Sequence, residues 1–391
     1  MLQLVKTKSL IDGTGTPSRP AGCFLVKNGL VADIGPAEKF ASLPANINVV
    51  DLSDRHVMPG MINAHTHLSI VPGEGNQSAQ MRLPAALNVL RSTPNILKDM
   101  RSGVTTMRIM GEEGGIDVEF KKAIEKGLIN GPRLIISTQG IAASHSHGVG
   151  LRPSDGVDEM RKHVRQNLAL GADFIKLFAT GGTSSPGKVL HTCPYTAEEI
   201  ATAVREAERA GTYVAAHAHG GTGLDLCIEQ GIRTIEHGAF INEAQLEQII
   251  KRQMWIVGTM AIMFHPNGIE QSDFHIPAIR EKVMLAREAS ATNFARILKS
   301  GANLAMGTDS VHGQIGFELE KLVEFGASTM QALLTVTKNA AKACRIEDKA
   351  GTLEVGKYAD FIALESNPLD DIRNLRRVDD VYKEGRLFQG I

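Results

Sequence analysis

The stretch RAGTYVAAHAHG, residues 209–220, joins a charged, alanine-rich segment to a short apolar run that finishes in two histidines. Its Gly211 is the residue type that most often ends a helix, and the run YVAAHA that follows reads as a buried strand. The same unit, a glycine followed by a short apolar run, recurs at RSGVTT (101–106), LGADF (170–174), EQGIRT (229–234) and KSGANL (299–304). This repetition predicts helices alternating with parallel strands.

Eight strand-like runs lie between about residues 57 and 345, with helical segments between them. They are VMPGMINA (57–64), VTTMRI (104–109), RLIIST (133–138), DFIKLF (173–178), YVAAHA (213–218), RTIEHG (233–238), MWIVGT (254–259) and NLAMGTD (303–309). Eight such β/α units are the number that closes a parallel barrel. The sequence therefore predicts an α/β fold of the TIM (β/α)8 barrel type over residues 59–345.

The two ends of the chain have a different character. Residues 2–58 alternate short apolar runs with Gly, Asn and Asp turns, which is typical of a small antiparallel sheet. After residue 345, the stretch GTLEVGKYADFIALES (351–366) returns to short strands. We expect residues 1–58 and 346–391 to form one composite β-sandwich domain beside the barrel.

Composition excludes several classes of partner. Lys and Arg number 42 against 43 Asp and Glu, so no basic surface is available to neutralise a nucleic-acid backbone. No apolar run approaches the ~20 residues that span a bilayer, and the N-terminus has no signal-peptide core. The cysteines are too far apart for a thiolate metal site or a disulfide scaffold: Cys23, Cys193, Cys227 and Cys344. We expect a soluble cytoplasmic protein without nucleic-acid or membrane partners.

The motif INAHTHL, residues 62–68, places His65 and His67 on one face of a strand, because residues two apart in a strand point the same way. Metal-competent side chains also end four other predicted strands: Lys176, His217, His237 and Asp309. Taken singly, each has a simpler interpretation, such as a histidine bonded to a carbonyl or an aspartate that caps a helix. Together they meet where this fold places active sites, and they predict a divalent-metal site.

Lys176 stands between Ile175 and Leu177, where burial of its ammonium is costly and lowers its pKa. A neutral amine can take up carbon dioxide, and the resulting carbamate can bridge two metal ions ~3.5–4 Å apart. The alternative is a Schiff-base lysine of an aldolase, which also requires a lowered pKa. The surrounding histidines and aspartate favour the carbamate.

Taken together, PGMINAHTHL, GADFIKLFATGG, VAAHAHG, IEHG, GTDS and NAAKACRIEDKAGTLEVGKYADFIAL resemble the amidohydrolase superfamily over essentially the whole chain. The second and third segments are similar to the imidazolonepropionase-like branch, which includes Xaa-Pro dipeptidases and zinc-dependent carboxypeptidases. The resemblance implies two divalent metal ions, usually Zn2+, one held by His65, His67 and Asp309 and the other by His217 and His237. Carbamylated Lys176 would bridge them. A hydroxide between the metals would attack a carbonyl carbon, and Asp309 would pass its proton to the leaving amine.

The resemblance also implies a histidine after the third strand that helps to bind the substrate carbonyl. In AASHSHGVG (142–150), His147 stands at that place and is our second predicted catalytic residue, although the family's following acid is absent. The other residues expected to contact substrate are His145, His219, Gly181, Gly182 and Arg108. For each a simpler interpretation stays open: a loop histidine in water, a plain glycine turn or a structural arginine.

We therefore expect a metal-dependent amidohydrolase that cleaves an amide bond in a small molecule, most plausibly a dipeptide or an N-acyl amino acid. The alternatives are hydrolysis of a carbamate, lactone or organophosphate ester, or a mononuclear deaminase. Such deaminases use a glutamate three residues after the fifth-strand histidine, where this chain has Gly220. A Schiff-base aldolase and a non-catalytic scaffold are more remote. The resemblance further suggests a homo-oligomer.

Overall fold

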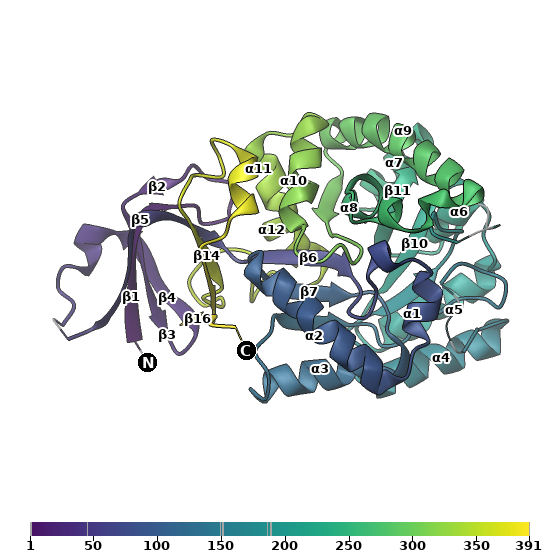
Figure 1. Cartoon of the computed structure of the whole chain (residues 1–391), viewed down its shortest axis with the longest axis horizontal. Coiled ribbons are helices and arrows are strands. Elements are labelled where there is room, and N and C mark those ends of the chain that lie inside the picture. Colours follow the sequence, from purple (N-terminus) through teal and green to yellow (C-terminus); the bar gives the residue numbers. More distant parts are fainter. Residues whose placement is uncertain are drawn as a thin grey trace.

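The computed structural model describes residues 2–44, 46–148, 150, 152–185, 187 and 190–390. Figure 1 shows a sheet of N-terminal strands, with the yellow C-terminal segment along its side, next to a larger body of helices around parallel strands. The functional residues predicted above belong to the larger body.

The strands of the larger body lie in two parallel sheets, ordered β6-β7-β8 and β13-β12-β11-β10-β9. Their bounds are β6 Met61–Thr66, β7 Val104–Ile109, β8 Arg133–Ile136, β9 Ile175–Phe178, β10 Val214–Gly220, β11 Thr234–Phe240, β12 Trp255–Gly258 and β13 Asn303–Met306. Each of the eight predicted runs overlaps one of these strands, and five of the runs contain the whole strand. The arrangement is a TIM-barrel-like α/β fold.

Two contacts link the edges of these sheets. An isolated parallel bridge pairs Ile141 with Leu177 of β9. On the other side, the backbone N–H of Asp309, just after β13, donates to the carbonyl of His65 in β6 over 2.9 Å. The ends of β6 and β13 are therefore neighbours, although they are far apart in the sequence.

The first predicted run, residues 57–64, is divided between two sheets. Its beginning belongs to β5 (Asn48–Pro59), where Met58 pairs with Ile362 of the antiparallel β14 (Phe361–Leu364). Its end forms β6, and Gly60 separates the two strands. A Cβ at Gly60 would lie 2.3 Å from Thr105 Oγ1, so only glycine allows the chain to pass so close to β7.

Helices surround the parallel strands (Figure 1). They are α1 Gln77–Met81, α2 Ala85–Arg101, α3 Ile116–Glu125, α4 Val157–Ala169, α5 Ala197–Arg209, α6 Gly221–Glu229, α7 Glu243–Lys251, α8 Ala261–Phe264, α9 Pro277–Ser300, α10 Ile315–Glu324, α11 Thr329–Thr335 and α12 Lys338–Ala343. The predicted role of glycine at helix ends is confirmed at Gly211 after α5 and Gly301 after α9, where φ is 74° and 76°. This left-handed backbone ends each helix and leads the chain into the next strand.

Both chain ends contribute to one sheet, ordered β16-β15-β14-β5-β1-β3-β4, with β2 paired to β1. The remaining strands are β1 Leu2–Leu10, β2 Arg19–Pro20, β3 Gly22–Lys27, β4 Leu30–Pro36, β15 Asp380–Lys383 and β16 Arg386–Leu387. Phe361 joins the two ends, since its ring packs edge-on against Phe24 at 5.1 Å and stacks on Tyr382 at 4.3 Å. A β-sandwich arrangement, and the predicted domain limits, stay predictions.

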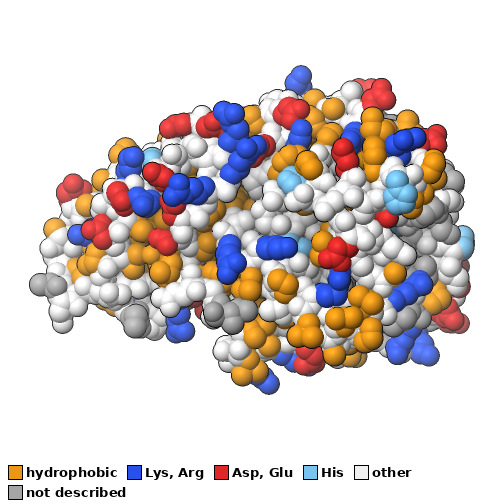
Figure 2. Space-filling model, viewed as in Figure 1, with side chains coloured by type: hydrophobic (Ala, Val, Ile, Leu, Met, Phe, Trp, Pro, Cys, Tyr) orange, Lys and Arg blue, Asp and Glu red, His pale blue; other side chains and the backbone are white. Residues whose placement is uncertain are grey.

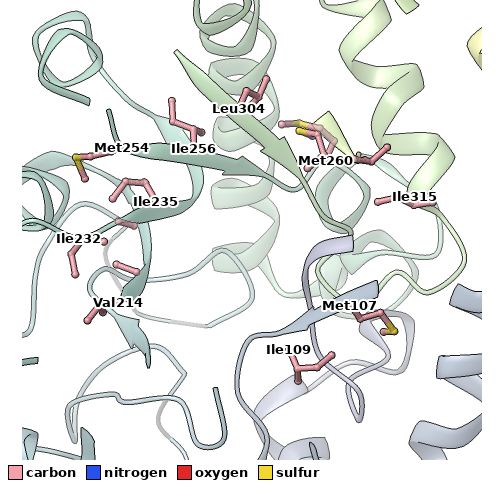
Figure 3. Close-up of a cluster of buried hydrophobic side chains, with 14 of the residues drawn as sticks. Met107, Ile109, Val214, Ile232, Ile235, Met254, Ile256, Met260, Leu304 and Ile315 are labelled. Carbon is pink, nitrogen blue, oxygen red and sulfur yellow. The ribbon is translucent and has the colours of Figure 1, made fainter. Parts of the chain in front are cut away.

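The parallel strands bury both faces, as strands covered by helices do. In β12, Ile256 belongs to the large cluster shown in Figure 3, whereas Trp255 and Val257 belong to a second cluster. On the face drawn in Figure 2, basic and acidic side chains are interspersed. Among the residues described, no helix is both long and apolar enough to cross a membrane.

Candidate metal centre

The six predicted metal-binding side chains line one cavity of about 230 Å³ at the carboxyl ends of the parallel strands. Its innermost members are in mutual contact: the ring centroids of His217 and His237 are 4.4 Å apart, and those of His65 and His237 are 4.6 Å apart. One ligand atom each from His65, His237 and Asp309 lie within 4.8 Å of one another. These groups are therefore close enough together to belong to one metal centre.

Asp309 is placed to act on both the first-strand histidines. Its Oδ1 lies 3.4 Å from His65 Nε2 and 3.7 Å from His67 Nε2. Burial alone would raise the pKa of this carboxyl, but its hydrogen bond with His65 and its electrostatic interactions with His65 and His67 hold it well below its ordinary value. Its side chain is 18% exposed and lines the cavity, so the ionised carboxyl group faces the cavity.

Each metal-competent histidine is oriented by a bond from its other ring nitrogen. The contacts are His65 Nδ1 with Glu236 Oε2 at 2.7 Å, His67 Nδ1 with the Gly111 carbonyl at 2.9 Å, His237 Nδ1 with Thr259 Oγ1 at 2.7 Å and His217 Nε2 with the Gly181 carbonyl at 3.1 Å. Since a carbonyl only accepts, His67 and His217 donate there and keep a lone pair on the opposite nitrogen. Burial lowers the pKa of His67 to about 4 and those of His217 and His237 well below their ordinary value, which keeps these rings neutral.

Two of the metal-competent residues have left-handed backbones, which is uncommon outside glycine: His237 with φ 74° and Asp309 with φ 46°. In a regular strand, Glu236 and His237 would face opposite sides. The turn at His237 explains how these neighbours both reach the same centre.

Lys176 is completely buried, and its Nζ has no hydrogen-bond partner among the described residues. The ammonium lies 4.9 Å from the centre of the Phe178 ring. Burial lowers the pKa of Lys176 to about 8, although the charges of Glu236 and Asp309 oppose the shift. Because this unpartnered amine also lines the cavity beside the histidines and Asp309, it fits a group that the protein chain itself does not supply.

Glu236 is a member of the site that we did not predict. It is fully buried and accepts hydrogen bonds from three groups: the His65 ring, the Arg108 guanidinium and the Thr234 hydroxyl. Burial would raise the pKa of Glu236, but Arg108 and His65 lower it to about 2. The signal was present in the sequence, because Glu236 is a charged residue inside the apolar strand run RTIEHG.

The predicted substrate contacts separate into three groups. His147 and His219 line the cavity, and the ring of His147 is 4.6 Å from that of His217. The two glycines lie behind lining residues: a Cβ at Gly182 would lie 2.4 Å from His147 Nε2, and the Gly181 carbonyl accepts a hydrogen bond from His217.

His145 and Arg108 do not line the cavity. His145 is an exposed side chain in the turn before His147. Arg108 is fully buried beneath the centre, with NH2 2.9 and 3.1 Å from the Glu236 oxygens and Nε 2.6 Å from the Ala64 carbonyl. The guanidinium donates its hydrogen bonds to groups in the protein interior, so its position argues against the expected contact with a substrate carboxylate.

Loops after β6 and β12 form the mouth of the cavity. Ser272 donates its hydroxyl to the Pro72 carbonyl over 2.7 Å, and the Asn76 N–H donates to Asp273 over 2.9 Å, which joins the two loops. The apolar side chains that line the cavity are Ile70, Met81, Phe178, Ile262, Met263, Ile276 and Ile279. The site thus combines a polar, metal-competent floor with a largely apolar wall, the usual composition of a small-molecule pocket.

Comparisons with known proteins agree with this geometry. The family model described as "Amidohydrolase family" matches residues 56–388. Ochratoxinase from Aspergillus niger is 27% identical over 97% of this chain and 85% of its own. Two solved structures superpose with a TM-score of 0.89 over the whole of both chains: a Xaa-Pro dipeptidase with methionine in its active site, at 29% identity, and a prolidase complexed with N-methylphosphonate-L-proline, at 26% identity. This chain belongs to the amidohydrolase family.

Proposed function

We propose that this enzyme hydrolyses an amide bond in a dipeptide or an N-acyl amino acid, with two divalent metal ions held by the six side chains at its centre. The observation that carries the proposal is the buried Lys176 amine, which has no hydrogen-bond partner among the described residues and lines the same cavity as the four histidines and Asp309. These donors fit a binuclear site with a carbamate bridge. Amide-hydrolysing relatives named ochratoxinase and Xaa-Pro dipeptidase support the reaction class.

In the proposed arrangement, His65, His67 and Asp309 hold one ion and His217 and His237 hold the other, with carbamylated Lys176 between them. When bound, such ions lower the pKa of water and polarise a carbonyl group. Zn2+ is the metal that the family resemblance implies, and the same imidazole and carboxylate ligands also suit manganese, cobalt and iron. The proposal also requires that the eight parallel strands close into a barrel, which the contacts Ile141–Leu177 and Asp309–His65 support.

Two residues have assigned roles in proton movement and substrate orientation. The low pKa of Asp309 keeps it ionised, so it can accept the proton of the attacking water and deliver it to the leaving amine. His147 can donate a hydrogen bond to the substrate carbonyl, because its Nδ1 is held 2.6 Å from Ser185 Oγ and its ring lies at the cavity wall. The apolar wall would exclude water and take up the substrate side chain.

The structure gives a reason to prefer hydrolysis to deamination. A deaminase of this superfamily would need a glutamate at position 220 as a proton shuttle. Here a Cβ on Gly220 would lie 2.7 Å from the carbonyl oxygen of Phe240, which leaves no room for a longer side chain. Carbamates, lactones and organophosphate esters remain the competing substrates, since the same centre would attack any suitably placed electrophile.

The test is a substrate screen with protein loaded in turn with Zn2+, Mn2+ and Co2+ in bicarbonate buffer. It includes dipeptides, N-acyl amino acids, carbamates, lactones and organophosphates. We expect amide hydrolysis that a chelator abolishes and that Lys176→Ala and Asp309→Asn reduce by at least about a hundredfold. His145→Ala, at the exposed surface, is the matched control and should leave the rate unchanged. Turnover of lactones or phosphotriesters alone would refute the proposal.

A further inference from the structure

The four metal-competent histidines have unequal supporting partners. His67 and His217 donate to backbone carbonyls, and His237 meets a hydroxyl, so these three contacts are with neutral groups. His65 alone among them is bonded to a carboxylate, that of Glu236. A carboxylate on the outer nitrogen makes an imidazole a stronger electron donor at its inner nitrogen and fixes its orientation.

Glu236 is itself held by groups that do not touch the cavity. Both of its oxygens receive the Arg108 guanidinium, at 2.9 and 3.1 Å, and both side chains are completely buried. Arg108 also donates from Nε to the carbonyl of Ala64, the residue directly before His65. One guanidinium therefore fixes the carboxylate and the ligand strand relative to each other.

From this asymmetry we infer that Glu236, clamped by Arg108, is a positioning residue that makes the metal ion bound by His65 the more tightly held of the two. The inference rests on the proposed metal centre. The effect of Glu236 needs only His65, because the clamp acts on that residue, whereas the Thr259 control also uses the proposed placement of His237 at the second ion. His65 Nδ1 contacts Glu236 Oε2 directly at 2.7 Å, so this carboxylate oxygen is the group that orients the ring.

The consequence is stepwise loading. The first ion should bind at His65 with an affinity at least about tenfold above that of the second, since outer-shell partners of metal ligands commonly contribute ten- to hundredfold in affinity. Loss of Glu236 should remove this advantage from one ion only. Loss of the Thr259 hydroxyl, which supports His237, should act on the other ion if His237 binds the second site.

The experiment is a titration of metal-free protein with Co2+ in bicarbonate buffer, followed by visible absorbance, with retained metal counted by mass spectrometry after dialysis. Wild-type protein should bind two ions in two resolved steps. Glu236→Gln, which preserves size, should weaken the tighter step by about ten- to hundredfold and leave the weaker step within about threefold. Thr259→Val is the matched control and should leave the tighter step unchanged.

The inference is overturned if Glu236→Gln leaves the tighter step unchanged, or if it weakens both steps equally, as a general loss of structure would. Circular dichroism melting identifies such a loss, and if Glu236→Gln does not fold, the same titration of Glu236→Asp decides the question. A wild-type protein that binds no Co2+ overturns the metal centre and this inference together. Stepwise binding by a protein that hydrolyses no amide refutes only the proposed reaction.

Discussion

Carbamylation of Lys176 is the chemical event on which the proposed centre depends. It requires the neutral amine, and the share of neutral amine follows from the lowered pKa of Lys176. At pH 7.5, a lysine of ordinary pKa 10.5 is about 0.1% neutral, whereas Lys176 with a pKa of about 8 is about one quarter neutral. Burial therefore raises the share of reactive amine by roughly two hundredfold. We expect carbon dioxide to be captured at Lys176 in preference to surface lysines.

The pH dependence has a definite sign. Only the neutral amine reacts, so at a fixed concentration of dissolved carbon dioxide the carbamate should increase as the pH rises through about 8 and decrease below it. The assay is 13C NMR of protein incubated with 13C-labelled bicarbonate between pH 6.5 and 8.5. Lys176→Arg should lose the carbamate signal, because a guanidinium stays protonated over this range.

Lys282 is a natural control for the role of the surroundings. Burial lowers its pKa to about 8 as well, but its ammonium donates to the carbonyls of Gly182 and Ser185. A carbamate there would face these two carbonyl acceptors, so we expect no signal that Lys282→Arg removes. Absence of label from the metal-loaded wild type, or equal label in Lys176→Arg, would refute the reasoning.

Three other changes test the structure around the centre. Arg108→Met should lower the free energy of unfolding by about 3–5 kcal/mol, because it leaves the buried Glu236 carboxylate without its ion-pair partner. In urea unfolding, the double variant with Glu236→Leu should recover part of this loss. An equal loss in the single and double variants would contradict this. Gly182→Ala should displace the His147 ring and lower kcat/KM by roughly ten- to hundredfold at nearly unchanged melting temperature, and an unchanged kcat/KM would show that His147 has no part in the reaction. The Thr196 hydroxyl caps α5 by accepting a hydrogen bond from the Glu199 N–H, so Thr196→Ala should lower the free energy of unfolding by about 1 kcal/mol in thermal unfolding and leave kcat unchanged. A change in kcat would link this helix to the site.

Much of the fold was readable from local sequence because its signals are local. A glycine that ends a helix, followed by an apolar run, needs only the backbone preferences of a few residues, and every predicted strand run overlaps an observed strand. The passage from the terminal sheet into β6 was misjudged for the opposite reason. VMPGMINA is one apolar run, and its division at Gly60 depends on the nearby side chain of Thr105, 45 positions further along the chain.

The candidate site shows the same difference between what local sequence reveals and what depends on residues distant in the chain. Spacing and strand ends were enough to propose a cluster, and one cavity is lined by all six of its members, because in a parallel α/β fold the carboxyl ends of all strands meet on one face: His65, His67, Lys176, His217, His237 and Asp309. Glu236 was missed and Arg108 was assigned to the substrate, since neither spacing nor residue type reveals that the two are buried against each other.

By itself, then, the sequence determined which side chains are available for chemistry and at which strand ends they stand, because those properties follow from short-range periodicity. Only the tertiary structure decided which of them are desolvated, which nitrogen of each histidine is engaged and what supports it. Desolvation and hydrogen bonding are set by neighbours distant in the chain, as with Lys176 in its buried position and Glu236 between Arg108 and His65. The reactivity of the centre arises from those distant neighbours.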